Sequence, residues 1–116
     1  MMTQDDQYQK LNQELRRGVL VLAALSQLRA RKYGYALIEE LTEGGLEIDQ
    51  GTLYPLLRRL EGQGLLHSEW DVSGSRPRRY YELTDDGERA LVGLAADWHA
   101  LVQVVRGLLE KFELEE

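Results

Sequence analysis

Residues 49–66, DQGTLYPLLRRLEGQGLL, decide the fold, because they predict one helix with an apolar face and a polar face. The apolar face consists of leucines spaced i, i+3, i+4 and i+7, as in a helix that packs against a core: Leu53, Leu56, Leu57 and Leu60. The polar face carries hydrogen-bond donors, two of them cationic: Gln50, Thr52, Tyr54, Arg58 and Arg59. Such a face is either solvated surface or a surface that contacts an anionic partner.

The ends of this helix are marked by residues with strong local preferences. Asp49 has the side chain of an N-cap, and the glycines of the EGQG segment are typical of a C-terminal stop. Pro55 is tolerated only in the first turn, since proline cannot donate the backbone hydrogen bond that later turns need. We therefore expect the helix to begin near Gly51 or Thr52.

Two more helices are predicted upstream. Residues 7–28 repeat apolar side chains at steps of three and four, and the second half of this segment is apolar almost all round. Residues 34–43 carry a shorter apolar stripe that ends at two glycines. Between the helices, residues 29–33 predict a polar turn, and residues 46–48 predict a short strand or an extended linker.

After the central helix the pattern becomes that of a β-hairpin. Two short runs of strand-type residues flank a polar segment rich in Ser, Gly and Pro. Tyr80 and Tyr81 point to opposite faces of a strand, so we expect one of them in the core. Trp70 is also expected in the core, because a strand tryptophan beside a helix more often fills a core than binds a ligand.

The last helix follows Thr84, which is a good N-cap, and it carries an apolar heptad seam. The seam residues step by three and four and are the predicted dimerisation residues: Leu91, Leu94, Trp98, Leu101, Val105, Leu108 and Phe112. A body as small as residues 1–84 cannot cover this stripe, so we expect a homodimer that pairs this helix and the first one about a two-fold axis. We interpret Trp98 as a dimer-core residue; the alternative is that two copies of it line a cavity for a flat aromatic effector.

Charge is distributed unevenly along the chain. The net charge of −6 argues against a protein that coats nucleic acid indiscriminately. Residues 50–81 nevertheless carry five arginines against three acids, whereas residues 82–116 carry nine acids against three bases. A basic surface is therefore confined to the central helix and the hairpin, and the acidic tail cannot be a nucleic-acid arm.

Several classes of protein are excluded by composition. The chain has no cysteine, no apolar run long enough to span a membrane and no apolar signal core, so we expect a cytoplasmic protein without disulfides. His67 and His99 share no spacing with each other or with an acid pair, so we expect no metal site and no cofactor. No nucleophile lies beside a base, and we therefore expect no enzymatic activity.

Three helices followed by a hairpin are the arrangement of a winged helix-turn-helix domain. The predicted fold class is α+β, mainly α, with this DNA-binding domain in residues 1–84 and a dimerisation helix in residues 85–116. In such domains the second helix of the turn enters the major groove, while the hairpin, or wing, contacts the DNA backbone or the minor groove. We expect base contacts from Gln50, Thr52 and Tyr54 and phosphate contacts from Arg58 and Arg59 on the central helix, with further cationic contacts from the wing tip through Arg76, Arg78 and Arg79.

The segments TLYPLLRRLEGQGLL (52–66) and SRPRRYYELTDDG (75–87), with Trp70 between them, resemble the PadR-like transcriptional regulators. The hallmarks of that family are TLYP in the recognition helix and a wing of the type PRxYYxLT. In length the chain resembles the short-form members, which have a single C-terminal helix. The resemblance implies a homodimeric repressor that binds double-stranded operator DNA at inverted repeats resembling ATGT and ACAT. One departure is Arg79, which stands where lysine is common. Arginine keeps the charge but changes the geometry, so a phosphate contact is still expected while its exact partner is left open.

The sequence leaves two functions from different classes open. The first is a dimeric transcriptional repressor that releases its operator when a small aromatic effector occupies the dimer interior. The second is a winged-helix protein-interaction module that has lost DNA binding and uses its acidic surface for assembly. The arginines retained in the wing favour the first.

Overall fold

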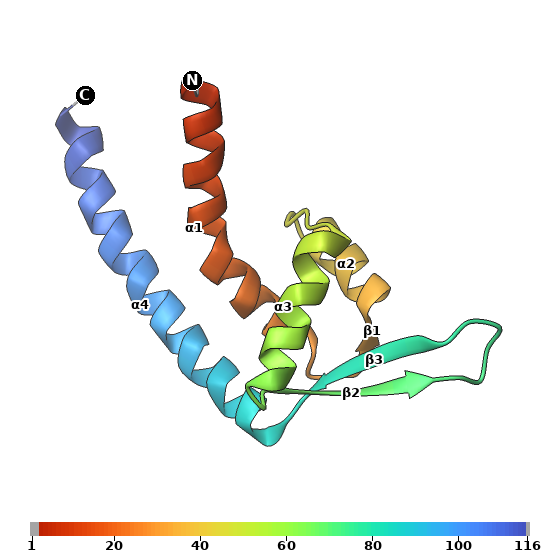
Figure 1. Cartoon of the computed structure of the whole chain (residues 1–116). Coiled ribbons are helices and arrows are strands. Elements are labelled where there is room, and N and C mark those ends of the chain that lie inside the picture. The colour runs from red at the N-terminus through yellow and green to blue at the C-terminus, as the bar shows by residue number, and fades with distance from the viewer. Residues whose placement is uncertain (1–2, 116) are drawn as a thin grey trace.

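The computed structural model of the chain describes residues 3–115, in the order α1, β1, α2, α3, β2, β3, α4 (Figure 1). The helices are α1 Gln4–Gln27, α2 Gly34–Glu43, α3 Gln50–Gly62 and α4 Asp85–Glu115. The strands are β1 Lys32–Tyr33, β2 Leu66–Asp71 and β3 Arg78–Leu83.

Helix α1 begins three residues before the predicted start. Its N-cap is Thr3, whose hydroxyl oxygen accepts from the backbone N–H of Asp6 at 3.1 Å, while the Asp6 carboxylate accepts from the N–H of Thr3 at 3.3 Å. This capping box satisfies two backbone donors that would otherwise lack a partner. The expectation relied on the apolar repeat alone and therefore missed a polar first turn.

Helix α3 is capped as predicted but begins one or two residues earlier. The Asp49 carboxylate accepts from the backbone N–H of Thr52 at 2.8 Å, and the first helical residue is Gln50. Pro55 consequently lies in the second turn of α3 and not in the first. The cap geometry fixes the start of this helix more strongly than the proline does.

The sheet contains a strand that was not expected. Residues 29–33 were predicted as a polar turn, but Lys32 and Tyr33 form β1 and pair antiparallel with Tyr81 and Tyr80 of β3. Strand β3 is therefore central, with β1 on one side and β2 on the other. The β2–β3 hairpin is in register from Leu66 opposite Leu83 to Asp71 opposite Arg78.

The core consists of leucines contributed by the three N-terminal helices. The most deeply buried side chains are Leu25, Leu28, Leu37, Leu53, Leu57 and Leu60. Tyr81 closes this core from β3, and burial raises the pKa of its hydroxyl. The placement of Trp70 in the core was wrong, because 60% of this residue is exposed near the outer end of the hairpin.

Thr84 joins the hairpin to α4, as predicted. Its hydroxyl oxygen accepts from the N–H of Gly87 at 3.0 Å, and its O–H donates to the carbonyl of Gly64 at 2.7 Å. Beyond Leu91 the helix leaves the body and runs beside α1, and the two helices diverge toward the termini (Figure 1). The structure thus confirms a winged helix with a long C-terminal helix. In residues 3–115, no helix has both the length and the apolar character needed to cross a membrane.

Candidate nucleic-acid interface

The polar face of α3 is open to solvent. Gln50, Thr52 and Arg58 are exposed, whereas Tyr54 is half-buried. The ring of Tyr54 lies against the start of α2, so closely that a Cβ added to Gly34 would be 2.5 Å from it. The absence of a side chain at position 34 therefore allows the tyrosine to pack beside the first turn of α2.

The three arginines of the wing have different environments. Arg76 is exposed in the loop between β2 and β3, and the Arg78 guanidinium lies 4.1 Å from the centre of the Tyr33 ring. Arg79 instead turns toward α3, where its Nη2 is 3.1 Å from the Glu61 carboxylate and its Nε donates to the Ser68 hydroxyl at 2.9 Å. Arg79 is thus neutralised within the body.

Four arginines of α3 and the outer wing form no ion pair among the described residues, as is also true of Arg16 and Arg17 on α1 and Arg106 on α4. Within residues 3–115, the structure gives an acidic partner to none of Arg58, Arg59, Arg76 and Arg78. Glu61, two residues after Arg59 in the sequence, pairs with Arg79 instead. This leaves four arginines whose charge is available to an anionic ligand.

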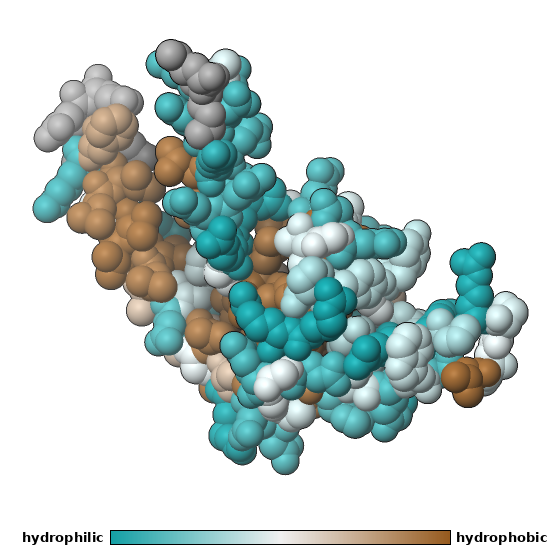
Figure 2. All heavy atoms as spheres, viewed as in Figure 1, coloured by the Kyte–Doolittle hydropathy of each residue, from teal (hydrophilic) through white to brown (hydrophobic). Residues whose placement is uncertain are grey.

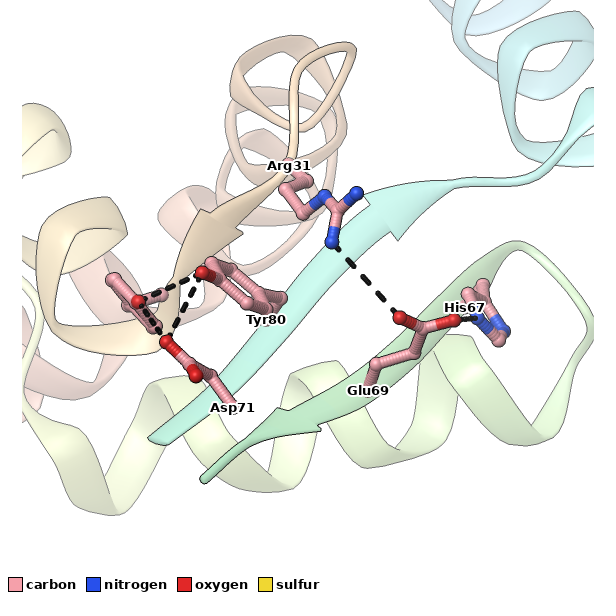
Figure 3. A network of polar contacts seen from close by, with 6 residues as sticks. Arg31, His67, Glu69, Asp71 and Tyr80 are labelled. Carbon is pink, nitrogen blue, oxygen red and sulfur yellow. Dashed lines mark hydrogen bonds and ion pairs between the residues drawn. The ribbon is translucent and has the colours of Figure 1, made fainter. Parts of the chain in front are cut away.

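A polar cluster ties the outer end of the paired part of the wing to β1 (Figure 3). The Tyr33 hydroxyl donates to the Asp71 carboxylate at 2.7 Å, and the Tyr80 hydroxyl lies 2.8 Å from that of Tyr33. The two rings stack with centroids 4.3 Å apart. Hydrogen bonds from Ser73 and from Tyr33 hold the pKa of Asp71 well below its usual range, and the bonds with Tyr80 and Asp71 raise that of Tyr33 above its own.

A second cluster lies on the same face of the sheet (Figure 3). Glu69 is 3.9 Å from Arg31 and 3.0 Å from His67, and the hydrogen bond with His67 lowers the pKa of Glu69. The Arg31 guanidinium is also 5.1 Å from the centre of the Tyr80 ring. These groups are exposed, so the ion pairs contribute little to stability.

A groove of about 360 Å³ separates α3 from the wing. Aromatic and cationic side chains dominate its lining, which consists of Tyr33, Gly34, Tyr35, Tyr54, Arg58, Trp70, Pro77, Arg78, Arg79 and Tyr81. The groove brings together Tyr54, Arg58 and Arg78 of the predicted DNA-binding set. The sequence did not identify Trp70 and Tyr35 as groove residues. Strand alternation and helical periodicity indicate the face on which a side chain lies but not how deeply it is buried.

The predicted seam of α4 is largely uncovered in one chain. Leu91 is buried in the core, but the other six seam residues are between 39% and 62% exposed. Figure 2 shows this surface as a continuous apolar band along α4. A groove of about 580 Å³ beside it is lined by Leu15 of α1 and by residues of α4, which are Trp98, Leu101, Val102, Val105, Arg106, Leu109 and Glu110.

Comparison with known proteins identifies the family. The family model for the transcriptional regulator PadR-like family matches residues 21–92. A transcriptional regulator of Mycobacterium tuberculosis is 43% identical over 77 residues, which are 66% of this chain and 69% of that protein.

Solved structures agree with this assignment. The crystal structure of a PadR family transcriptional regulator from Eggerthella lenta is 55% identical, with a TM-score of 0.83 over 91% of this chain and 95% of that one. A PadR-like transcription factor from Bacteroides fragilis is 36% identical, with a TM-score of 0.72 over 85% of this chain and 98% of that one. Proteins of this family are DNA-binding regulators and not enzymes. The chain therefore belongs to the PadR-like family of transcriptional regulators.

Proposed function

We propose that the protein is a dimeric, sequence-specific repressor that binds an inverted-repeat operator in the cytoplasm. The observation that carries the proposal is the arginine distribution between α3 and the outer wing. Arg58, Arg76 and Arg78 have no acidic partner among the described residues, and no acid lines the groove between the two elements. In this arrangement Gln50, Thr52 and Tyr54 contact bases, and the three arginines contact phosphates.

Dimerisation is proposed through α4 with help from α1. Six exposed seam residues lie on α4, and α1 carries three exposed apolar residues, Tyr8, Leu11 and Leu15, of which Leu15 lines the groove shared with α4. An isolated chain would leave this apolar band exposed to water. Pairing of two identical chains about a two-fold axis would bury the band of each protomer against that of the other. A two-fold axis also sets two copies of α3 about one DNA turn, roughly 34 Å, apart. A monomeric mass at micromolar concentration in sedimentation equilibrium would contradict this pairing.

A small aromatic effector is proposed to bind beside Trp98. The supporting feature is the groove of about 580 Å³ between α1 and α4, whose lining is mostly apolar. A second copy of Trp98 would complete an aromatic wall across the two-fold axis. An effector bound there releases DNA only if it prefers a different spacing of the two α3 helices.

The effector proposal is tested by tryptophan emission. Aromatic cations and neutral planar dyes should quench the emission of the wild-type protein, and Trp98→Ala should abolish the effect. Trp70→Phe, which removes the other tryptophan, should leave the quenching intact. Equal quenching in Trp98→Ala would refute the Trp98 site.

The repressor function is tested by binding to the DNA upstream of the protein's own gene at several salt concentrations. Each phosphate contact contributes about 0.9 to the slope of log K against log salt, so Arg76→Ala with Arg78→Ala should weaken binding and flatten that slope. Arg89→Ala is the matched control, because Arg89 pairs with Asp86 on α4. If the protein does not bind this DNA, or if its affinity changes neither with salt nor with substitution of the wing arginines, the protein-interaction module is favoured instead.

A further inference from the structure

Trp70 occupies an unusual position for a strand tryptophan. It lies on the face of β2 that also carries the buried Leu66 and the half-buried Ser68, yet 60% of the residue is exposed. Its cross-strand partner is Arg79, in the outer half of the hairpin. The core-facing side of the hairpin thus continues into the groove between α3 and the wing. Trp70 is the outermost aromatic residue on that side of the hairpin.

The orientation of this indole is supported by contacts behind it. The Arg79 guanidinium lies 5.5 Å from the centre of the Trp70 ring. That guanidinium is itself held by Glu61 of α3 and by Ser68 of β2. A cation over a ring face is attracted by the ring quadrupole, so Arg79 fixes one side of the indole. The remaining surface of the ring is available to a ligand in the groove.

The chemistry of the groove indicates what that ligand is. Arg58 of α3 and Arg78 of the wing line it together with Trp70, and Tyr35 adds a second exposed aromatic ring. Among the residues that the structure describes, no acidic side chain lines the groove. Cations beside exposed rings suit a chain of phosphates joined by apolar sugars, which is the chemistry of a nucleic-acid backbone.

We propose, resting on the DNA-binding function proposed above, that Trp70 is a further DNA-contacting residue. Its indole packs on the deoxyribose of the strand that passes between α3 and the wing, while Arg58 and Arg78 pair with the flanking phosphates. Arg79 acts as a positioning residue, because it lies over the Trp70 ring and is already paired with Glu61. The contact is apolar and therefore adds affinity without adding to the salt dependence of binding.

Fluorescence separates this proposal from the general function. Duplex DNA from the upstream region is titrated into wild-type protein and into Trp70→Phe, and both the anisotropy of labelled DNA and tryptophan emission are recorded. The expected result is an emission change in the wild type that follows the anisotropy curve and is lost in Trp70→Phe.

The outcomes distinguish two kinds of failure. Anisotropy that rises while the wild type and Trp70→Phe show the same emission response, or none, would overturn the Trp70 contact and leave the DNA-binding function intact. Anisotropy that does not rise with any duplex would overturn both. A Trp70 emission typical of a covered indole before DNA is added would show that a second copy of the chain occupies the groove, and it would also overturn the contact.

Affinity measurements supply an independent readout. Trp70→Ala should weaken DNA binding about tenfold, about 1.4 kcal/mol, because covering an indole removes roughly 60 Å² of apolar surface from water. The slope of log K against log salt should stay unchanged, in contrast to Arg78→Ala. Val72→Ala is the matched control, since Val72 is 73% exposed on the same wing but does not line the groove. Equal losses for Trp70→Ala and Val72→Ala would contradict the proposal.

Discussion

The leucines of the winged-helix body and those of the projecting part of α4 have opposite environments. In the body, Leu53, Leu57 and Leu60 of α3 are at most 1% exposed. On α4, Leu101 and Leu108 are 57% and 62% exposed, although they follow an equally regular repeat. The same residue type at the same kind of spacing is thus fully buried in one region and mostly uncovered in the other.

This difference means that the body is stabilised within one chain, whereas the projecting part of α4 leaves apolar surface that the proposed dimer would cover. The body has its apolar faces covered by its own helices and by Tyr81, so its folding energy comes from within one chain. The projecting part of α4 gains little of that energy from α1, because their shared groove is still open. Changes to the body should therefore act at every protein concentration, and changes to α4 should act mainly through association.

The largest effect is expected in the body. Leu57→Ala removes a fully buried side chain and leaves a cavity, so it should lower the free energy of unfolding by about 2–5 kcal/mol. Denaturant titration at two protein concentrations measures this loss, and the loss should be equal at both. A loss below about 1 kcal/mol would mean that α3 is not the centre of the core.

A somewhat smaller effect is expected where the two regions join. A Cβ on Gly87 would lie 2.1 Å from the Leu65 carbonyl oxygen, which accepts from the N–H of Thr84 at 3.1 Å. Gly87→Ala must shift this backbone and should destabilise the protein by about 1–3 kcal/mol in thermal or denaturant unfolding. Gly93→Ala on the same helix meets no neighbour within 4 Å and should instead be neutral or stabilising. Equal effects of the two variants would contradict the close contact at the junction.

In the projecting region, Leu101→Ala should hardly change the stability of a dilute chain. Its side chain is mostly exposed in one protomer, so the free energy of unfolding should fall by less than about 0.5 kcal/mol at low concentration. Sedimentation should nevertheless show a weaker dimer, with the dissociation constant raised about tenfold or more. A large loss of stability in the dilute protein would mean that α4 packs on its own body more closely than the groove indicates.

The difference between the regions also explains what the sequence could predict. Periodicity and caps are local signals, so the helices, the hairpin, Asp49, Thr84 and the apolar repeat of α4 were all predictable. Strand β1 was not, because two residues acquire strand geometry only by pairing with Tyr80 and Tyr81, nearly fifty positions away.

The site shows the same limit. Strand alternation placed Trp70 on the correct face of β2, but the end of the core, which determines exposure, is set by how far α3 extends beneath the sheet. In the sequence, Arg79 is a third cation of the wing beside Arg76 and Arg78. The fold places it next to Glu61, with which it forms an ion pair. The DNA-binding role of the α3 residues and of Arg76 and Arg78 stays a prediction, because it concerns a partner and not the chain itself.

The smallest effect is expected at the polar cluster that ties the wing to β1, and it should depend on pH. Hydrogen bonds from Ser73 and Tyr33 favour the ionised form of Asp71 and hold its pKa below the ordinary value. A depressed carboxyl pKa stabilises the fold above the unfolded pKa of about 4, and this contribution is lost as the pH falls through the folded pKa. Asp71→Asn should therefore be less stable than the wild type at neutral pH, and the difference in their free energies of unfolding should become smaller in acid. Ser73→Ala removes the largest cause of the lowered Asp71 pKa, so it should show the same pH trend with a smaller loss of stability. A loss of stability in Asp71→Asn that stays constant from neutral pH into acid would show that Asp71 acts through packing and not through its charge.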